Sequence, residues 1–154
     1  MPNIKLPKEF AEQWLAALRS GEYIQGDGYL AQSQRDEEAE VIPNAPFCYC
    51  CLGVGAKICK IEENLLEQRE YTSDVWEDVP EPIRGETFVS HILSSLNDGL
   101  AKDGYEKAIS DGFIFRKEVI HHLIPNEVDK YYRVRFSFEQ IADFIQDNIE
   151  YTDV

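Results

Sequence analysis

All four cysteines of the chain, Cys48, Cys50, Cys51 and Cys59, lie in one short segment, FCYCCLGVGAKIC, at residues 47–59. Thiolates can bind zinc or act as nucleophiles, whereas buried thiols pack as small apolar groups. The spacing is Cys-x-Cys-Cys, then seven residues, then Cys, in one cluster, whereas zinc sites usually have two Cys-x-x-Cys knuckles. The other side chains of the segment are mostly apolar. We therefore predict that the cysteines belong to the hydrophobic core and that the protein holds no metal and needs no cofactor.

A catalytic thiolate is the alternative. Cys50 or Cys51 at the start of a helix, with His91 or His121 as the base, would make the protein a small hydrolase or transferase. His121 and His122 fall in an expected strand, where neighbouring side chains point to opposite faces, so the two cannot easily share one metal. The residues favour binding over catalysis.

A second group of candidate residues follows the first expected helix. Arg19, Tyr23 and Gln25 could hold a small ligand such as a signalling nucleotide, with a bidentate arginine, a stacking ring and a hydrogen-bonding amide. The other interpretation of Arg19 is a cation at the negative end of the helix dipole. The nearby Gly26-Asp27-Gly28 is too short for a phosphate loop and predicts a turn.

The net charge of −14 excludes nucleic acid as a partner, because nucleic-acid binding depends on basic residues that neutralise phosphates. The acid excess is concentrated in residues 62–86 and 137–154. One interpretation is solubility. The other is a surface that docks on a basic protein, for which Glu77, Asp78 and Glu81 are the candidate contacts.

Apolar periodicity predicts helices over residues 7–20 and 87–97, and Ser137 with Gln140 forms a capping box that starts a last helix. A strand at 47–51 leads into a helix that reaches about residue 66. Gly53 and Gly55 inside that helix indicate either that another element approaches closely or that the first turn is irregular. Residues 67–86 are expected to be an irregular acidic loop, and 100–112 a short helix.

Short strands are expected at 23–25 and 29–31 around the turn, a mobile surface loop at 32–46, and a hairpin of 118–124 with 131–136. The predicted fold is α+β, a single domain over 1–154, with three or four helices packed on a small antiparallel sheet built from short hairpins. No segment has the roughly 20 apolar residues of a membrane span, and the N-terminus lacks a signal peptide.

Four blocks of the sequence resemble a family of small uncharacterised proteins from phages and prophage-bearing bacteria. The blocks are WLAALRSGEYIQGDGYL (14–30), FCYCCLGV (47–54), LND (96–98) and FEQIADFI (138–145). The chain departs from the family at Gly55 and Ala56, where relatives continue with leucine and cysteine, and at 99–135, which resembles an insertion. The resemblance implies a setting in the cytoplasm of a bacterial host, not a mechanism.

These observations favour a small acidic accessory protein that acts by binding. It would mask a host protein with a basic surface, or sequester a small nucleotide-like ligand, and such masking could serve counter-defence. The cysteine enzyme is the alternative.

Overall fold

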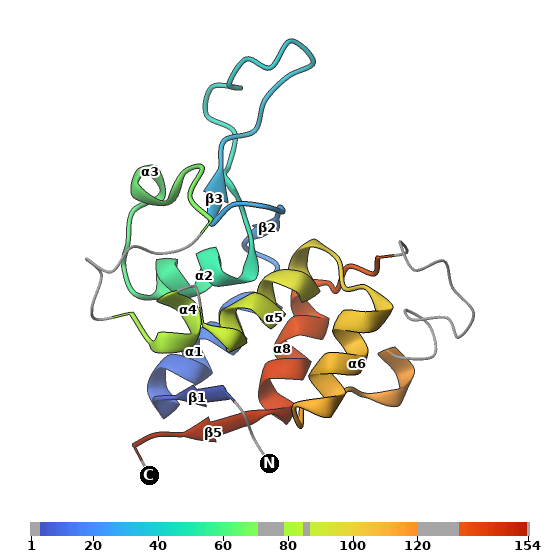
Figure 1. The fold of residues 1–154 in the computed structure, drawn as a ribbon. Coiled ribbons are helices and arrows are strands. Elements are labelled where there is room, and N and C mark those ends of the chain that lie inside the picture. The colour runs from blue at the N-terminus through green and yellow to red at the C-terminus, as the bar shows by residue number, and fades with distance from the viewer. Residues whose placement is uncertain (1–3, 71–78, 85–86, 120–132, 154) are drawn as a thin grey trace.

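The computed structural model of the chain describes residues 4–70, 79–84, 87–119 and 133–153 (Figure 1). It is an α+β fold, as predicted. The expected three or four helices are too few, because five helices of the described residues have eight residues or more and two others have four.

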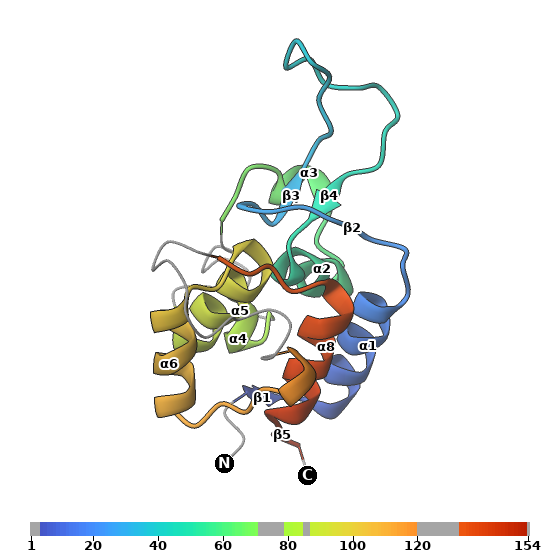
Figure 2. The same ribbon diagram turned by 90° about the vertical axis from the view of Figure 1, so that its right-hand side faces the viewer.

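The longest helix, α1 (Lys8–Arg19), buries the apolar stripe that its sequence predicts, with Trp14 and Leu18 at its centre. It packs against α2 (Cys51–Ile58) and α8 (Phe138–Asp147), and Figure 2 shows α1 and α8 side by side. The other helices are α3 (Glu63–Leu66), α4 (Glu81–Arg84), α5 (Phe88–Asp98) and α6 (Lys102–Ser110). Buried side chains from all of these helices form one hydrophobic cluster.

Two helix predictions need correction. The helix that was expected to reach residue 66 ends at Ile58, because Lys60 adopts a positive φ of 67° that an α-helix cannot continue. The chain then restarts as α3. The segment expected to be an irregular loop contains α4, in which Pro82 lies in the first turn, where the absence of an N–H group is tolerated.

The helix starts follow the sequence closely. Ser137 and Gln140 make the predicted capping box of α8, with the Ser137 hydroxyl accepting from the Gln140 N–H at 3.2 Å. Thr87 and Ser90 make the same arrangement at α5, and Gly99 follows that helix as expected. These local signals therefore place the two helices that carry much of the core.

The three-stranded sheet differs from the expected hairpin. Its order is β2 (Ile24–Gln25), β4 (Cys48–Tyr49), β3 (Ala31–Gln32), so β4 lies between the two strands that were expected to pair. β2 is parallel to β4, and β3 is antiparallel to it. The Gly26 N–H donates to the Tyr49 carbonyl at 2.7 Å, which holds the segment after β2 on β4 instead of turning it back on itself.

The second sheet joins the two ends of the described chain. β1 (Ile4–Leu6) pairs in parallel with β5 (Ile149–Tyr151), with Ile4 opposite Ile149. The Asp153 carboxylate then accepts from the Lys8 N–H at 3.0 Å, and so caps α1. The expectation of an antiparallel sheet is therefore wrong for two of the three strand pairings in the described residues.

The predicted hairpin of 118–124 with 131–136 is wrong at its described ends. Glu118 and Val119 are helical, and Val134 forms an antiparallel bridge with Leu100 instead of a nearby strand. Residues 120–132, with His121 and His122, lie outside the described residues. The described flanks of 99–135 pack into the common core, where Phe113 and Phe115 contact Phe144.

Within the described ranges, no helix combines the length and the apolar character that a membrane crossing requires.

Candidate functional site

The thiols of Cys50 and Cys51 lie in the core, with 6% and 0% of each residue exposed. The Cys50 Sγ accepts from the Gly53 N–H at 3.4 Å and caps α2, and the Cys51 Sγ donates to the Leu93 carbonyl at 3.5 Å. Burial raises the pKa of Cys50 to about 12 and the pKa of Cys51 well above its ordinary value. The core interpretation is confirmed for these two, while Cys48 and Cys59 are half-buried.

These environments oppose thiolate chemistry. A nucleophilic cysteine needs a lowered pKa and access to substrate, and both buried thiols have the opposite properties. His91, one of the two bases considered, is exposed on α5, and His121 lies outside the described residues. The residues that the structure describes include no group of three His, Cys, Asp or Glu side chains placed to hold a metal ion.

Cys51→Ala is expected to lower the free energy of unfolding by about 1–3 kcal/mol, because it leaves a cavity in the core. Urea denaturation followed by circular dichroism measures this, with Cys48→Ala as the half-buried control and a smaller expected loss. A thiol reagent should label Cys50 and Cys51 only as the protein unfolds. Rapid labelling of Cys51 in the native protein would contradict the core assignment.

Arg19 joins two helices. One guanidinium nitrogen, Nη2, donates to the Asp143 carboxylate at 2.8 Å and to the Gln146 amide oxygen at 2.7 Å, both on α8. The side chain is about one-third exposed, and the ion pair holds the C-terminal end of α1 against α8. Neither interpretation from the sequence included this pair, since Asp143 lies far along the chain.

The other two ligand candidates are also engaged within the fold. Tyr23 is half-buried and packs edge-on against Tyr49, with ring centroids 5.3 Å apart. The Gln25 amide donates to the Phe136 carbonyl at 2.8 Å and to Asn97 Oδ1 at 3.1 Å, and it accepts from the Phe138 N–H at 3.1 Å. Gln25 therefore connects β2 to α5 and to the start of α8.

The partner of Gln25, Asn97, was not among the predicted residues. Its fully buried side chain donates to the Gly26 carbonyl at 2.8 Å and accepts from the Cys51 N–H at 3.2 Å. Its backbone carbonyl accepts from Arg135 Nε at 3.1 Å. The sequence feature that could have indicated Asn97 is Leu-Asn-Asp at 96–98, because it places an amide side chain beside the apolar stripe of α5. This network fixes the fold around residues 25–28 and uses the polar groups proposed for a ligand.

The predicted partner contacts divide between described and undescribed residues. Glu77 and Asp78 lie outside the described residues. Glu81 is exposed in the first turn of α4, at the edge of a cavity of about 200 Å³ that is also lined by Lys5, Thr87 and Phe88. This volume is below the roughly 300–1,000 Å³ of typical ligand pockets. Arg19, Tyr23 and Gln25 are not among the residues that line this cavity, so it gives no support to a ligand held by them.

Basic side chains partly neutralise the acids of α8. The sequence of residues 137–154 does not show this, because it contains no basic residue. Arg116 contacts the Asp147 carboxylate through two nitrogens, at 2.8 and 3.2 Å, and the Asp143 carboxylate at 3.0 Å. Asp143 is thus shared between Arg116 and Arg19. Arg19 and Arg116 come from other parts of the chain, and they reduce the acid excess of residues 137–154 at these two carboxylates.

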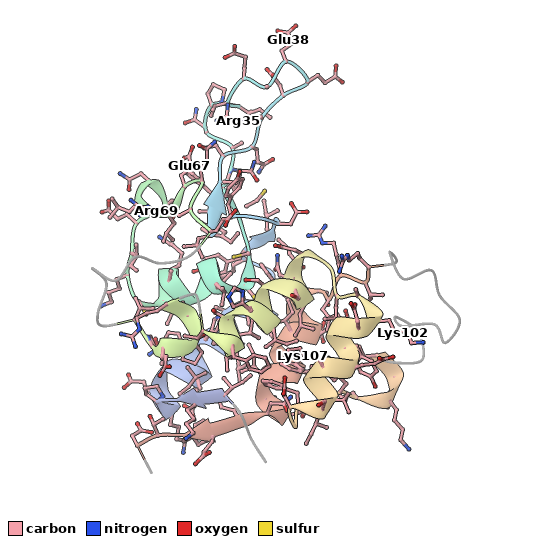
Figure 3. The ribbon with its side chains drawn as sticks, viewed as in Figure 1. Arg35, Glu38, Glu67, Arg69, Lys102 and Lys107 are labelled. Carbon is pink, nitrogen blue, oxygen red and sulfur yellow. The ribbon has the colours of Figure 1, made fainter. Side chains whose placement is uncertain are left out.

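A different acidic surface stands clear of the body. Residues 34–46, here called the arm, extend between β3 and β4 and project away from the helices in both views (Figures 1 and 2). Figure 3 shows Glu38 at the far end of the arm and Arg35 nearer to its base. Four exposed acids surround the tip and are called the arm acids: Asp36, Glu37, Glu38 and Glu40.

The arm is ordered by its own hydrogen bonds. Near the base, the Ile42 N–H donates to the Gln34 carbonyl at 2.9 Å, and Arg35 forms an antiparallel bridge with Val41. At the tip, the Asp36 carboxylate accepts from the backbone N–H groups of Glu38 and Glu40, at 2.9 and 3.0 Å. The sequence predicted a surface loop here, but these bonds define a folded projection.

Two features distinguish the arm from an ordinary hairpin loop. Hairpin loops usually span about 2–5 residues, and much longer connections are often functional. In the described residues, no ion pair involves any of the arm acids, so their charge is available to another molecule. We take the arm as the candidate functional site.

Comparisons of the chain with protein-family models, curated proteins and solved structures gave no match.

Proposed function

We propose that this protein acts by binding, and that its partner is a protein with a basic surface that the arm contacts. The observation that carries the proposal is the projection from the body, on an ordered arm, of four acids that form no ion pair with any residue the structure describes. Opposite charges across an interface accelerate association and select the partner. A negatively charged nucleic acid would instead be repelled.

The resemblance of four sequence blocks to phage and prophage proteins supports a setting for this binding. In that setting the protein would work in the bacterial host cytoplasm and mask a host protein, with counter-defence as one use. Glu81 and its undescribed neighbours Glu77 and Asp78 would form a second acidic contact in the same proposal.

The structure gives less support to the two other hypotheses, a nucleotide ligand and a cysteine enzyme. A nucleotide held by Arg19 and Gln25 would compete with the internal hydrogen bonds of both side chains. An enzyme using Cys50 or Cys51 would need a thiol that substrate can reach, and both are buried.

The test is affinity capture from a bacterial lysate with three forms of the protein. The arm-charge variant carries Glu37→Lys, Glu38→Lys and Glu40→Lys. A control variant carries Glu12→Lys, Glu22→Lys and Glu118→Lys, which change the net charge equally at exposed positions elsewhere. We expect the parent and the control to retain the same basic protein at low salt, and the arm-charge variant to lose it.

Salt provides an independent measure, because screening over about 10 Å at 0.1 M weakens exposed charge pairs. Retention by the parent should fall steeply as salt rises. The proposal fails if all three forms capture the same proteins with the same salt dependence.

A further inference from the structure

The arm carries an apolar pair as well as charge. Val41 and Ile42 are 48% and 38% exposed, and both lie in the part of the arm that follows the acids. Successive residues of an extended strand point to opposite sides, and one side is normally covered by the body of the protein. Both remain exposed because the arm stands away from the helices (Figure 2).

We infer that Val41 and Ile42, here called the anchor pair, insert into an apolar pocket on the partner protein, and that lysine and arginine side chains of the partner surround this pocket. The inference rests on the proposed function and specifies how the partner is recognised. The arm acids, which precede and adjoin the anchor pair, would then face the basic rim.

An apolar pair beside a group of charges resembles the usual division of a protein interface into a well-packed centre and a charged rim. A few well-packed side chains at the centre of an interface supply most of the binding energy, and the charged rim sets selectivity and association rate. The arm adds preorganisation, because the backbone N–H groups of Glu40 and Ile42 donate to the Asp36 carboxylate and the Gln34 carbonyl and already fix the backbone that presents the pair. Fixing a binding segment in advance reduces the entropy lost on association.

Charge decides between the possible occupants of this surface. A second copy of this chain would bring its own negative charge of −14 to the arm acids, and a nucleic acid would bring phosphates. Both are repelled, while a basic protein is attracted. The occupant that fits is therefore a protein with an apolar pocket inside a positive surface.

Photo-crosslinking in bacterial cells tests the inference. Pro43→benzoylphenylalanine places the probe at an exposed position beside Ile42, and Glu12→benzoylphenylalanine is the remote control. We expect an adduct with a basic protein from position 43 only. Mass spectrometry of the adduct should map the crosslink to an apolar site with neighbouring lysines or arginines.

Variants then separate the anchor from the charge. Val41→Ser with Ile42→Ser should reduce the yield of that adduct at least about tenfold, the effect of a small loss of binding free energy. Leu65→Ser with Ile109→Ser, at apolar residues of similar exposure (45% and 44%), should leave the yield unchanged. Thermal melting of each variant verifies that the fold is intact.

The possible outcomes distinguish the two proposals. If the arm-charge substitutions remove the adduct but the anchor substitutions do not, the inference is overturned and the proposed function stands. If neither set matters, both are overturned. An adduct between two copies of this chain, or none from position 43, also overturns the inference.

Discussion

Gly53→Ala is expected to lower the free energy of unfolding by about 3 kcal/mol or more, the upper end for overpacked cores. A Cβ at this position would overlap the carbonyl oxygen of Leu30. That backbone cannot easily move away, because the Leu30 N–H donates to the Arg69 carbonyl at 2.6 Å and the Leu30 side chain is fully buried. Urea denaturation with circular dichroism measures the loss.

Gly104→Ala is the matched control, since Gly104 also lies inside a helix, α6. Its added Cβ would lie 3.1 Å from Leu100 Cδ1, the end of a flexible side chain that can shift. Helix propensity favours alanine by about 1 kcal/mol, so stability should change little or rise. Equal effects of the two substitutions would show that helix propensity, not the approach of Leu30, governs Gly53. If Gly53→Ala does not fold at all while Gly104→Ala folds, the result still supports the prediction that the close approach of Leu30 requires glycine at position 53.

Asn97→Ala is expected to lower the free energy of unfolding by about 3 kcal/mol, because it leaves buried polar groups without partners. The Cys51 N–H and the Gly26 carbonyl both bond to the Asn97 side chain inside the fold. Gln25 would also lose one of its acceptors. The same urea experiment measures the change, and hydrogen exchange at the Cys51 amide should accelerate.

Asn64→Ala, at an exposed position of α3, serves as the control and should change stability by less than about 0.5 kcal/mol. A loss below 1 kcal/mol for Asn97→Ala would mean that water replaces its side chain, and that the network of Gln25 and Asn97 contributes little to the fold.

Local signals in the sequence were sufficient for some elements. The apolar stripe around Trp14 and the capping box at Ser137 depend on residues within a few positions of each other, and α1 and α8 appear where they indicate. The two glycines of the cysteine segment indicated either a close approach or an irregular first turn, because a helix interior tolerates glycine poorly. The structure shows the close approach, of Leu30 to Gly53 and of Ile83 to Gly55.

Long-range pairings were not predictable in the same way. β1 and β5 are three residues each, and nothing within Ile4–Leu6 identifies a partner near the other end of the chain. The same holds for β4, which separates β2 from β3, and for the bridge of Val134 to Leu100. Short strands carry too little pattern to specify their neighbours.

The candidate site shows the same division. Residue types suggested Arg19 and Gln25 as ligand contacts, but their partners Asp143 and Phe136 come from distant segments that the sequence could not place beside them. The arm was visible only as a polar stretch with two prolines. Its order depends on the particular bonds of Asp36. Its exposure depends on its projection away from the described helices, which is a property of the whole fold.

The pairing of β1 with β5 also sets the order of events during translation. The ribosome produces Ile4–Leu6 well before their strand partner, Ile149–Tyr151, and before Asp153, whose carboxylate caps α1. A nascent polypeptide that has not reached these residues lacks both. Contacts between distant positions already slow folding. Here the translating ribosome itself delays closure of the fold until residues 149–153 have emerged.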